Sequence, residues 1–303
     1  MSVSNLSFEE VDPLLSWSDL TDALAAGHLL PKAEIADSFL YRDADTMLSR
    51  AAWIDGLGQT VKTATIFPGN EAQGLPKIHG ALTLFSDQTG QLEAVIDFHL
   101  VTKWKTAGDS LLAAKRLARP DSKRFLILGA GTVAGNMIAA YRSHWPEAEV
   151  TIWSRNPEKG QAFADAHGVG FEANLQSAVK AADVICTATM STEPVLMGDW
   201  LQPGQHVDMI GAYRPDMREA DDVALTRARL FVDSRDTTLD HIGELKIPLA
   251  SGAISRGDVV ASFYEPDLFK RGAEDEITIC KNGGGAHLDL MTSRYILNAW
   301  GAR

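Results

Sequence analysis

The sequence predicts an α/β protein with a central Rossmann domain, a doubly wound parallel sheet, and a second, mixed α+β domain. In the second half of the chain, short apolar strand segments such as FLILGAG, VTIWSR and HVDMIGA alternate with helical segments. Strands that are apolar on both faces are typical of a parallel sheet covered by helices. Earlier in the chain, VKTATIFPGN, HGALTLFSDQTG and LEAVIDFHL look like strands joined by short turns. They predict a largely antiparallel sheet.

The N-terminal segment has the apolar spacing of a helix. Between Ser18 and Leu40, apolar residues recur three or four positions apart, which is typical of an amphipathic helix. Ser18 and Asp19 are the candidate capping residues, and Pro31 is expected to divide the segment into two helices. The sequence therefore predicts a helical entry before the strand region.

Two further helices set the expected domain boundaries. A helix is predicted from Thr106 to about Ala118, because Pro120 cannot continue it. Apolar residues from Leu288 to Trp300 predict a final helix that can return to the first domain. We therefore expect one domain of residues 1–118 and 284–303 and a dinucleotide-binding domain of residues 119–283.

Composition narrows the class of protein. With 40 acidic against 28 basic side chains, the formal net charge is −12, which argues against a nucleic-acid partner. The N-terminus lacks a secretory pattern, and no stretch approaches the about 20 apolar residues that span a bilayer. The two cysteines, Cys186 and Cys280, stand among apolar residues and predict buried thiols. We expect a soluble, cytoplasmic protein with a small-molecule substrate, no metal site and no membrane partner.

A glycine-rich loop points to the cofactor. The segment FLILGAGTVAGNMIAAY places Gly129, Gly131 and Ala134 between a short apolar strand and a helix. Gly129 permits the tight turn, Gly131 lets the backbone approach a pyrophosphate, and Ala134 keeps the helix close to the sheet. The helix start, which includes Thr132 and Val133, offers free N–H groups to the phosphates. A nicotinamide dinucleotide is the expected cofactor.

The residues after the second strand favour NADPH over NADH. Enzymes that use NAD present an acidic side chain there, whereas this chain has Ser154, Arg155 and Asn156. A hydroxyl and a guanidinium suit the 2′-phosphate of NADP, and Lys159 is a further candidate. NADH is expected to bind more weakly. The remaining cofactor-binding candidates lie at the ends of VICTAT and HVDMIGAY, and they are Thr187, Ala188, Thr189, Ile210, Gly211 and Tyr213.

Lysines in the strand region are candidates for substrate binding. Lys62 stands among β-branched residues, and Lys103 and Lys105 flank Trp104 just before the helix expected from Thr106. A cation and the N–H groups of a helix start can hold a carboxylate together. For each lysine taken alone, a solvated charge at a sheet edge is the competing interpretation.

A family resemblance strengthens this interpretation. In order, VKTATIFPGN, VTKWKTAGDSLLAAKRLARPDSKRFLILGAG, ADVICTAT and PGQHVDMIGAYRPDMREAD resemble the ornithine cyclodeaminase and mu-crystallin family, from about Ala51 to Leu290. The resemblance implies a split substrate-binding and dimerisation domain, a central Rossmann domain and a homodimer. It also implies chemistry at an imine or amine carbon beside a carboxylate.

The resemblance assigns roles to the two lysines. Lys62 matches the lysine of a GxK segment that meets the substrate carboxylate or helps proton transfer, with Thr60 in place of the glycine. Lys105 stands where most members carry the arginine of an RTAA motif that clamps the carboxylate. Lysine keeps the charge but loses the bidentate fork. Arg42 and Arg50 are candidate helpers of this clamp, and His79 matches a polar position in the family pocket, although a core or turn histidine is a competing interpretation.

One further position bears on the reaction. Cyclodeaminases of the family carry an acidic residue where this chain has Tyr213. Without that carboxylate, oxidation and cyclisation of ornithine lose their base, whereas reduction of a preformed cyclic ketimine does not need it. The segment GAYRPDMRE resembles the family's branch of pyrroline-2-carboxylate and piperideine-2-carboxylate reductases.

The resemblance therefore implies NADPH-dependent reduction of Δ1-pyrroline-2-carboxylate to L-proline, with conversion of the piperideine homologue to L-pipecolate as an extension. Two alternatives stay open at this point. One is an ornithine cyclodeaminase or an alanine-type amino-acid dehydrogenase. The other is a non-catalytic, crystallin-like protein that binds NADPH.

Overall fold

A computed structural model describes residues 3–303 of the chain. These residues form two compact units. The first unit contains the N-terminal part up to Lys105 together with Gly285–Arg303, and the second contains Thr106–Gly284. The first unit is therefore built from two segments that are far apart in the sequence.

The first unit contains a sheet that, within residues 3–303, has six strands in the order β1-β6-β5-β4-β3-β2. The strands are β1 (Ser4–Leu6), β2 (Glu34–Arg42), β3 (Asp45–Ile54), β4 (Gly58–Ile66), β5 (Ile78–Phe85) and β6 (Leu92–Asp97). Its helices are α1 (Phe8–Val11), η1 (Asp12–Leu14), α2 (Trp17–Gly27), η2 (Pro68–Gln73) and α10 (Ala286–Gly301), with α3 (Phe98–Leu117) shared by the two units. All neighbouring strands are antiparallel except β1 and β6, which confirms the predicted antiparallel region.

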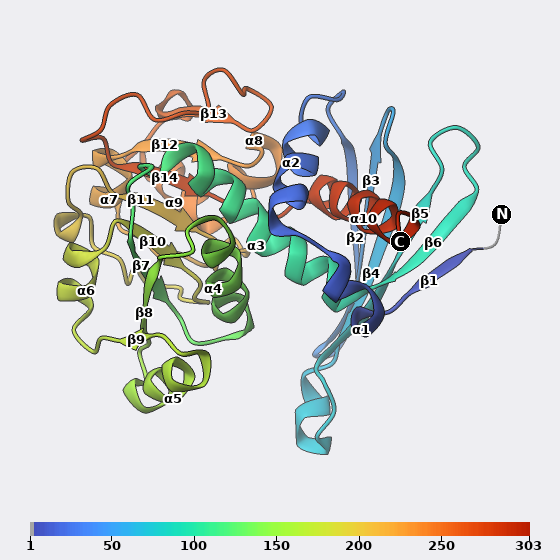
Figure 1. Ribbon diagram of the computed structural model, residues 1–303, viewed down its shortest axis with the longest axis horizontal. Coiled ribbons are helices and arrows are strands. Elements are labelled where there is room, and N and C mark those ends of the chain that lie inside the picture. The colour runs from blue at the N-terminus through green and yellow to red at the C-terminus, as the bar shows by residue number, and fades with distance from the viewer. Residues whose placement is uncertain (1–2) are drawn as a thin grey trace. The chain divides into compact units, whose positions relative to one another are not determined.

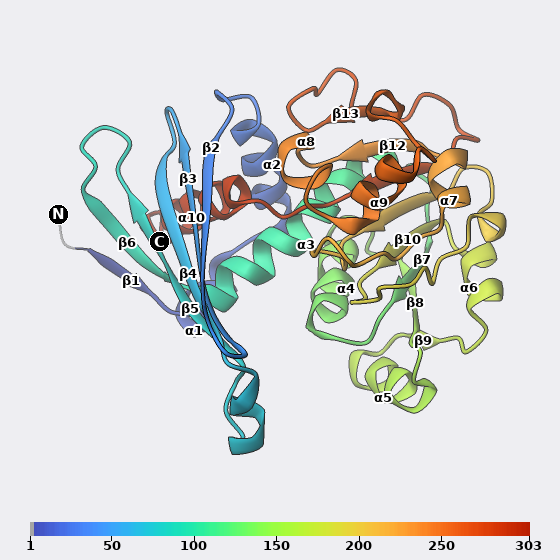
Figure 2. The same ribbon diagram turned by 180° about the vertical axis from the view of Figure 1, so that it is seen from behind.

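Helix α10 covers one face of this sheet (Figure 1). Side chains alternate along β4, and Thr60, Lys62 and Ala64 are buried, as a strand with one covered face requires. Helix α2 packs closely on α10, because a Cβ added at Gly27 would lie 2.7 Å from Cγ of Met291. The short helix η2 extends from the hairpin of β4 and β5, beyond the sheet (Figure 2).

The second unit contains a parallel sheet of eight strands within the described part of the chain, in the order β13-β12-β14-β11-β10-β7-β8-β9. The strands are β7 (Arg124–Leu128), β8 (Glu149–Trp153), β9 (Gly170–Phe171), β10 (Val184–Thr187), β11 (His206–Met209), β12 (Arg229–Val232), β13 (Val259–Ser262) and β14 (Thr278–Lys281). The helices are α4 (Thr132–His144), α5 (Pro157–His167), α6 (Leu175–Ala181), η3 (Gly198–Trp200), α7 (Asp222–Arg227), α8 (Arg235–Thr238), α9 (Gly243–Ser251) and η4 (Arg256–Asp258). Every strand pair in this sheet is parallel, which confirms the predicted doubly wound domain.

The two faces of the parallel sheet differ in polarity. Helices α6, α7 and α9 pack on one face through a continuous apolar cluster, and α9 is seen in front of the sheet in Figure 2. On the other face, Tyr141 of α4 packs on Phe125 and donates a 2.6 Å hydrogen bond to Asp208. His206 lies 3.1 Å from the same carboxylate. Both cysteines are buried and free, as predicted.

The prediction of a second N-terminal helix, after Pro31, is wrong. Residues Glu34–Arg42 form strand β2, which pairs with β3 along its whole length. Ile35 and Phe39 are four residues apart, and a spacing of four places side chains on one face in a helix and in a strand alike. The hairpin decides the outcome, since Asp43 takes a left-handed conformation (φ 52°) that turns the chain back.

The start of the first helix also differs from the prediction. Helix α2 begins at Trp17, and Ser16 caps it by accepting a hydrogen bond from the N–H of Asp19. Ser18 and Asp19 are therefore helical residues. Trp17 joins the helix because its ring packs on Trp104, with 4.0 Å between ring centroids.

Helix α3 begins at Phe98 and not near Thr106. Asp97 ends β6 and accepts a 2.9 Å hydrogen bond from the N–H of Leu100, as a helix cap does. Leu100 and Val101 are fully buried, so packing prevails over their strand-like appearance. Lys105 consequently lies inside the helix. The prediction that N–H groups of a helix start hold a carboxylate together with Lys105 is therefore wrong. Within residues 3–303, no helix is long and apolar enough to cross a bilayer.

Candidate active site

The glycine loop connects β7 to α4 in the second unit. Gly129 has a φ of 128°, and a Cβ added to it would lie 2.6 Å from the carbonyl oxygen of Ala188. The turn therefore requires glycine at this position. Gly131 precedes the first residue of α4, Thr132, and Ala134 is fully buried beneath the helix. Each residue thus lies where the motif predicts it.

The helix start can receive a phosphate. No side chain among residues 3–303 caps α4, so the helix presents its first N–H groups without a side-chain acceptor. A Cβ added at Gly131 would meet no described atom within 4 Å. Gly131 and Thr132 are exposed, while Val133 is half-buried. An open, uncapped helix N-terminus fits a pyrophosphate.

The residues after β8 form a polar turn. Ser154 is half-buried, whereas Arg155 and Lys159 are exposed. Asn156 caps α5 by accepting a 2.9 Å hydrogen bond from the N–H of Lys159. Gly160 packs tightly here, since an added Cβ would lie 3.0 Å from Cβ of Ser154. The turn presents a hydroxyl and a guanidinium but no carboxylate at positions 154–156.

Two further loops lie at the same edge of the sheet as the glycine loop. Strand β10 pairs with β7 on one side and with β11 on the other, all in parallel. The carboxyl ends of these strands therefore lie together. They bring together the predicted residues Thr187, Ala188 and Thr189 after β10 and Ile210, Gly211 and Tyr213 after β11. Within residues 3–303, the buried hydroxyl of Thr187 has no hydrogen-bond partner.

The two predicted lysines of the first unit meet at one carboxylate. Nζ of Lys62 and Nζ of Lys105 each lie 2.8 Å from Oδ1 of Asp289. Lys62 comes from β4, Lys105 from α3 and Asp289 from the first turn of α10. All three side chains are at most 7% exposed. Two buried cations therefore share one carboxylate oxygen, and its other oxygen, Oδ2, has no hydrogen-bond partner among residues 3–303.

This arrangement changes the acidity of its members. Burial lowers the pKa of Lys105 to about 7, with Asp289 opposing the shift and Lys62 and Arg50 adding to it. Burial works to raise the pKa of Asp289, but the charges of Lys105 and Lys62 outweigh it and hold this pKa below its usual value. Lys105 can therefore exist in either protonation state near neutral pH.

Arg50 and Arg42 take different positions. Arg50 is the cross-strand neighbour of Lys62, and its guanidinium binds both carboxylate oxygens of Asp37 at 2.8 to 3.1 Å. Arg42 lies at the end of the β2–β3 hairpin, is mostly exposed and pairs with Asp45 at 2.7 Å. The structure thus brings Arg50, but not Arg42, beside the lysines.

His79 and Lys103 also lie away from the lysine pair. His79 is exposed and pairs with Thr65, while Lys62 pairs with Leu82. Thr65 and Lys62 are three residues apart on β4, so their side chains point to opposite faces of the sheet. His79 lies on the same face as its partner Thr65, and therefore on the face opposite to Lys62. Lys103 binds Asp12 at 2.7 Å. It is two residues from Lys105 on α3, which directs the two side chains to nearly opposite sides of the helix.

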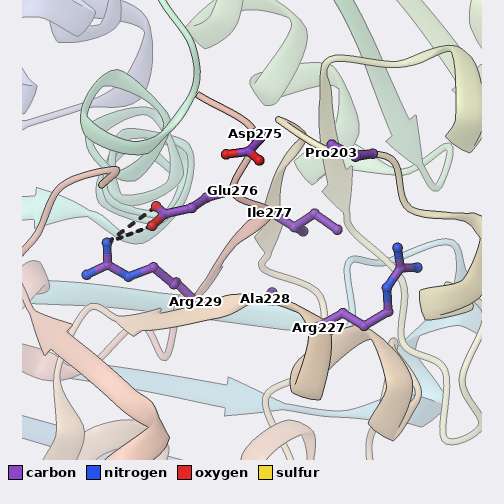
Figure 3. A pocket seen from close by; sticks show the side chains of 7 residues that line it. All are labelled: Pro203, Arg227, Ala228, Arg229, Asp275, Glu276 and Ile277. Carbon is purple, nitrogen blue, oxygen red and sulfur yellow. Dashed lines mark hydrogen bonds and ion pairs between the residues drawn. The ribbon is translucent and has the colours of Figure 1, made fainter. Parts of the chain in front are cut away.

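A cavity of about 390 Å³ lies elsewhere in the second unit (Figure 3). It is lined at the amino ends of β12 and β14 by Arg227, Arg229, Glu276 and Ile277, among others. Arg229 pairs with Glu276, and Arg227 donates to two backbone carbonyl groups. Since the strands are parallel, this cavity opens at the edge opposite the glycine loop. Both of its arginines are thus paired, and we assign the cavity no ligand.

Residues 41–303 match the model of the ornithine cyclodeaminase/mu-crystallin family. The match covers most of the chain, including the glycine loop and all three residues of the lysine cluster. The chain belongs to this family. The predicted resemblance is confirmed.

Among the curated members of the ornithine cyclodeaminase/mu-crystallin family, the Δ1-pyrroline-2-carboxylate reductase of Paracoccus denitrificans (strain Pd 1222) is 50% identical over 301 residues, which cover 96% of this chain and 95% of that protein. Two solved structures also match. One is the Δ1-pyrroline-2-carboxylate reductase of Thermococcus litoralis in complex with NADH and L-proline, with 25% identity, a TM-score of 0.88 and coverage of 99% and 98% of the two chains. The other is an archaeal alanine dehydrogenase dimer with bound NAD, with 27% identity, a TM-score of 0.89 and coverage of 100% and 97%.

Asp289 is the residue of the lysine cluster that the sequence reasoning missed. It is an acidic residue between Leu288 and Leu290 in the first turn of a helix whose N-terminal half is buried. A charge within an apolar stretch of an amphipathic helix is a usable signal, because a buried carboxylate requires a partner. The identity of that partner cannot be read from the sequence, since Lys62 and Lys105 come from distant segments.

Proposed function

We propose that this chain is an NADPH-dependent ketimine reductase that converts Δ1-pyrroline-2-carboxylate to L-proline, and that the six-membered piperideine homologue is a second substrate. The observation that carries the proposal is the buried cluster of Lys62, Lys105 and Asp289, in which two ammonium groups share one carboxylate. These three groups have a net positive charge when both lysines are protonated. The 50% identity to a Δ1-pyrroline-2-carboxylate reductase supports the same reaction.

The lysine cluster is suited to holding the substrate carboxylate. An anion that binds there supplies the second negative charge, and this favours the protonated form of Lys105. With the carboxylate fixed by two buried cationic side chains, the neighbouring C2 of the ring has a restricted orientation, which lowers the entropic barrier to reaction. Asp289 keeps the two Nζ atoms together when no substrate is bound.

The glycine loop and the loops after β8, β10 and β11 hold the cofactor in this proposal. A nicotinamide dinucleotide is supported by the open start of α4 and by relatives solved with NADH or NAD. When bound, the nicotinamide supplies the hydride that reduces the imine carbon. The chain contributes the phosphate-binding N–H groups, the field of the lysines and the fixed orientation of the ring.

The preference for NADPH rests on the turn after β8. Arg155 is exposed and Ser154 half-buried, and neither a carboxylate nor another acidic group occupies positions 154–156. A guanidinium suits the dianionic 2′-phosphate, which an acidic side chain would repel. NADH is expected to bind to the same loops with lower affinity.

A homodimer is part of the proposal. Strand β2 is the edge of its sheet, and all nine of its residues are exposed. Phe39, Leu40 and Tyr41 are 49 to 73% exposed, and a long apolar edge strand is normally covered by a partner. A structural relative forms a dimer. Light scattering at micromolar concentration is expected to give the mass of two chains, and the mass of one chain would contradict it.

An alanine dehydrogenase is the second candidate function, because a structure of that activity matches the whole chain. One assay separates the candidates. In three reactions the purified protein is mixed with NADPH and either the pyrroline substrate, the piperideine homologue, or pyruvate with ammonia. In a fourth reaction it is mixed with NAD and ornithine. The absorbance of the reduced nicotinamide is followed in each.

We expect the highest kcat/KM with a cyclic ketimine. A faster reaction with pyruvate and ammonia, or with ornithine, would replace the proposal. Binding of NADPH without turnover of any of these compounds would leave a nucleotide-binding protein.

A further inference from the structure

Two fully buried glutamates lie behind the cofactor loops of the second unit. Glu219 stands in the segment before α7, and Glu244 is the second residue of α9. Neither was singled out from the sequence. Both lie in the same unit as the glycine loop.

The carboxylate of Glu219 joins the two loops that follow β10 and β11. Its Oε1 accepts hydrogen bonds from the N–H of Thr189 at 2.7 Å and from the hydroxyl of the same residue at 2.8 Å. Its Oε2 accepts from the N–H of Gly211 at 2.8 Å and from the N–H of Ala212 at 3.0 Å. Each carboxylate oxygen thus accepts two hydrogen bonds, and all four donors come from the protein itself.

The two loops approach each other closely at this point. A Cβ added at Gly211 would lie 2.1 Å from the carbonyl oxygen of Thr189 and 2.5 Å from Oε1 of Glu219. Glycine is therefore required for the contact. Because Thr189 and Gly211 are both predicted to contact the cofactor, Glu219 fixes the spacing of two parts of one binding surface.

Glu244 holds the segment that carries Glu219. Its Oε2 accepts from the N–H of Glu219 at 2.7 Å, and its Oε1 accepts from the N–H of Ala220 at 3.0 Å. Burial and the charge of Glu219 raise the pKa of Glu244 to about 7, against the opposing effects of Lys281 and the two N–H groups. The buried Nζ of Lys281 donates a 2.8 Å hydrogen bond to the carbonyl of Met209, at the end of β11. Glu219, Glu244 and Lys281 thus hold the two loops from their buried side.

The strand order indicates which part of the cofactor these loops serve. Strand β8, whose end carries Arg155, lies on one side of β7, and β10 and β11 lie on the other. A dinucleotide whose pyrophosphate lies at the end of β7 extends to both sides. With the adenosine half toward β8, the loops after β10 and β11 face the nicotinamide half.

We propose that Glu219 is a positioning residue for the nicotinamide half of the cofactor, and that Glu244 determines where Glu219 lies. The inference rests on the proposed function, because it assumes a nicotinamide dinucleotide at the glycine loop. The proposal adds a buried carboxylate that acts on the cofactor indirectly, through the two loops that it joins.

The first test measures the clamp without any ligand. In Glu219→Gln, one of the two acceptor oxygens becomes an NH₂ group that faces N–H donors. Hydrogen exchange of the cofactor-free protein is compared for wild type, Glu219→Gln and the exposed control Glu147→Gln. We expect the amides of Thr189, Gly211 and Ala212 to exchange at least about tenfold faster in Glu219→Gln alone. Unchanged exchange at these amides would overturn the proposal.

The second test separates the two halves of the cofactor. Binding of NADPH and of adenosine 2′,5′-bisphosphate, which lacks the nicotinamide, is measured by calorimetry for the same variants. For Glu219→Gln we expect the Kd of NADPH to rise about tenfold or more and that of the bisphosphate to stay within about twofold. For Glu244→Gln we expect the same pattern with a smaller change. An equal loss for both nucleotides would overturn the assignment to the nicotinamide half.

A milder variant covers the case in which Glu219→Gln does not fold. Thr189→Val keeps the shape of the side chain and removes one of the four hydrogen bonds. We expect faster exchange of the Gly211 and Ala212 amides in the cofactor-free protein. If Thr189 only contacted the cofactor and did not support the clamp, its substitution would not change this exchange. Wild-type exchange in Thr189→Val would contradict the clamp. If the clamp results hold but no ketimine is reduced, the proposed function fails and the clamp stands.

Discussion

The two units carry their proposed anion sites on different parts of the chain. In the second unit, the proposed phosphate site is made of backbone, with Gly131 open to solvent and the start of α4 uncapped by any side chain of the described residues. In the first unit, the proposed carboxylate site is made of side chains, with Lys62 and Lys105 buried around Asp289. The phosphate site needs small residues next to each other in the sequence. The carboxylate site needs three residues from distant segments.

This difference predicts different sensitivities. A backbone site is damaged by an added side chain but depends little on any one charge, because its donors are N–H groups. A buried side-chain site depends on every charge, because removing one leaves another without its partner in a medium of low polarity. Charge substitutions should therefore have larger effects in the first unit than in the second.

The largest effect is expected from Asp289→Asn. The substitution leaves two buried ammonium groups without their carboxylate, and breaking such a pair costs about 3 to 5 kcal/mol. We expect the free energy of unfolding to fall by that amount, as measured by urea denaturation followed by circular dichroism. The exposed Asp55→Asn in the same unit is the control and should change it by less than about 0.5 kcal/mol.

A double variant sharpens this result. Adding Lys105→Met to Asp289→Asn removes one of the two unbalanced charges, so part of the lost stability should return. If Asp289→Asn is as stable as wild type, Asp289 does not balance the lysines, and the comparison between the two sites fails.

The second effect concerns activity. Lys105→Met should lower kcat/KM for the ketimine by about thirty- to several-thousandfold, because the loss of a partner from a buried carboxylate costs about 2 to 5 kcal/mol. The Kd of NADPH should stay near the wild-type value. Lys103→Met is the matched control, since Lys103 lies on the same helix and binds Asp12 instead. Lys105→Arg should retain more activity than Lys105→Met. If steady-state kinetics show wild-type kcat/KM for Lys105→Met, Lys105 does not hold the substrate carboxylate, and Lys62 becomes the candidate.

A smaller effect is expected in the second unit. Arg155→Asp should raise the Kd of NADPH by about ten- to a hundredfold, because one charge-assisted contact is lost and a carboxylate is brought near the 2′-phosphate. The Kd of NADH should change far less, since the backbone donors at the start of α4 are untouched. Fluorescence titration with both cofactors measures this, and equal losses would show that Arg155 does not contact the 2′-phosphate.

The smallest effect is a pH dependence. Lys105 is protonated below its pKa of about 7 and neutral above it. The neutral form cannot attract a carboxylate, so kcat/KM should fall as the pH rises above about 7, toward a limit of about tenfold per pH unit. Lys105→Arg should lose this limb, because the guanidinium stays charged, while the titration of the imine itself remains in both proteins. Identical profiles for the two proteins would assign the limb to the substrate.

The same contrast explains how much was predictable. The turn and the helix start of the glycine loop were predicted correctly, because they depend on residues within one short segment. The strand run and the parallel sheet were predictable for the same reason. The lysine cluster was predicted only in part, since the sequence indicates Lys62 and Lys105 as cations but not that Asp289 binds both.

The errors arise where one local pattern fits two structures. Ile35 and Phe39 satisfy the helical and the strand spacing equally, and the pairing of β2 with β3 decides between them. The start of α3 was misplaced because Leu100 and Val101 look like strand residues and are buried in a helix. Glu219 carried no local signal at all, because its partners are N–H groups of loops that come together only in the folded sheet.

The last helix has a consequence for the order in which the protein forms during synthesis. Helix α10 covers the sheet of the first unit and carries Asp289, yet it leaves the ribosome after the whole second unit. Until then the sheet lacks that cover, and Lys62 and Lys105 lack their carboxylate. The second unit, Thr106–Gly284, is a continuous segment and can complete its core while translation continues. The first unit cannot complete its core until α10 has been made, so the unit whose strands are made earliest is expected to finish folding after the second unit.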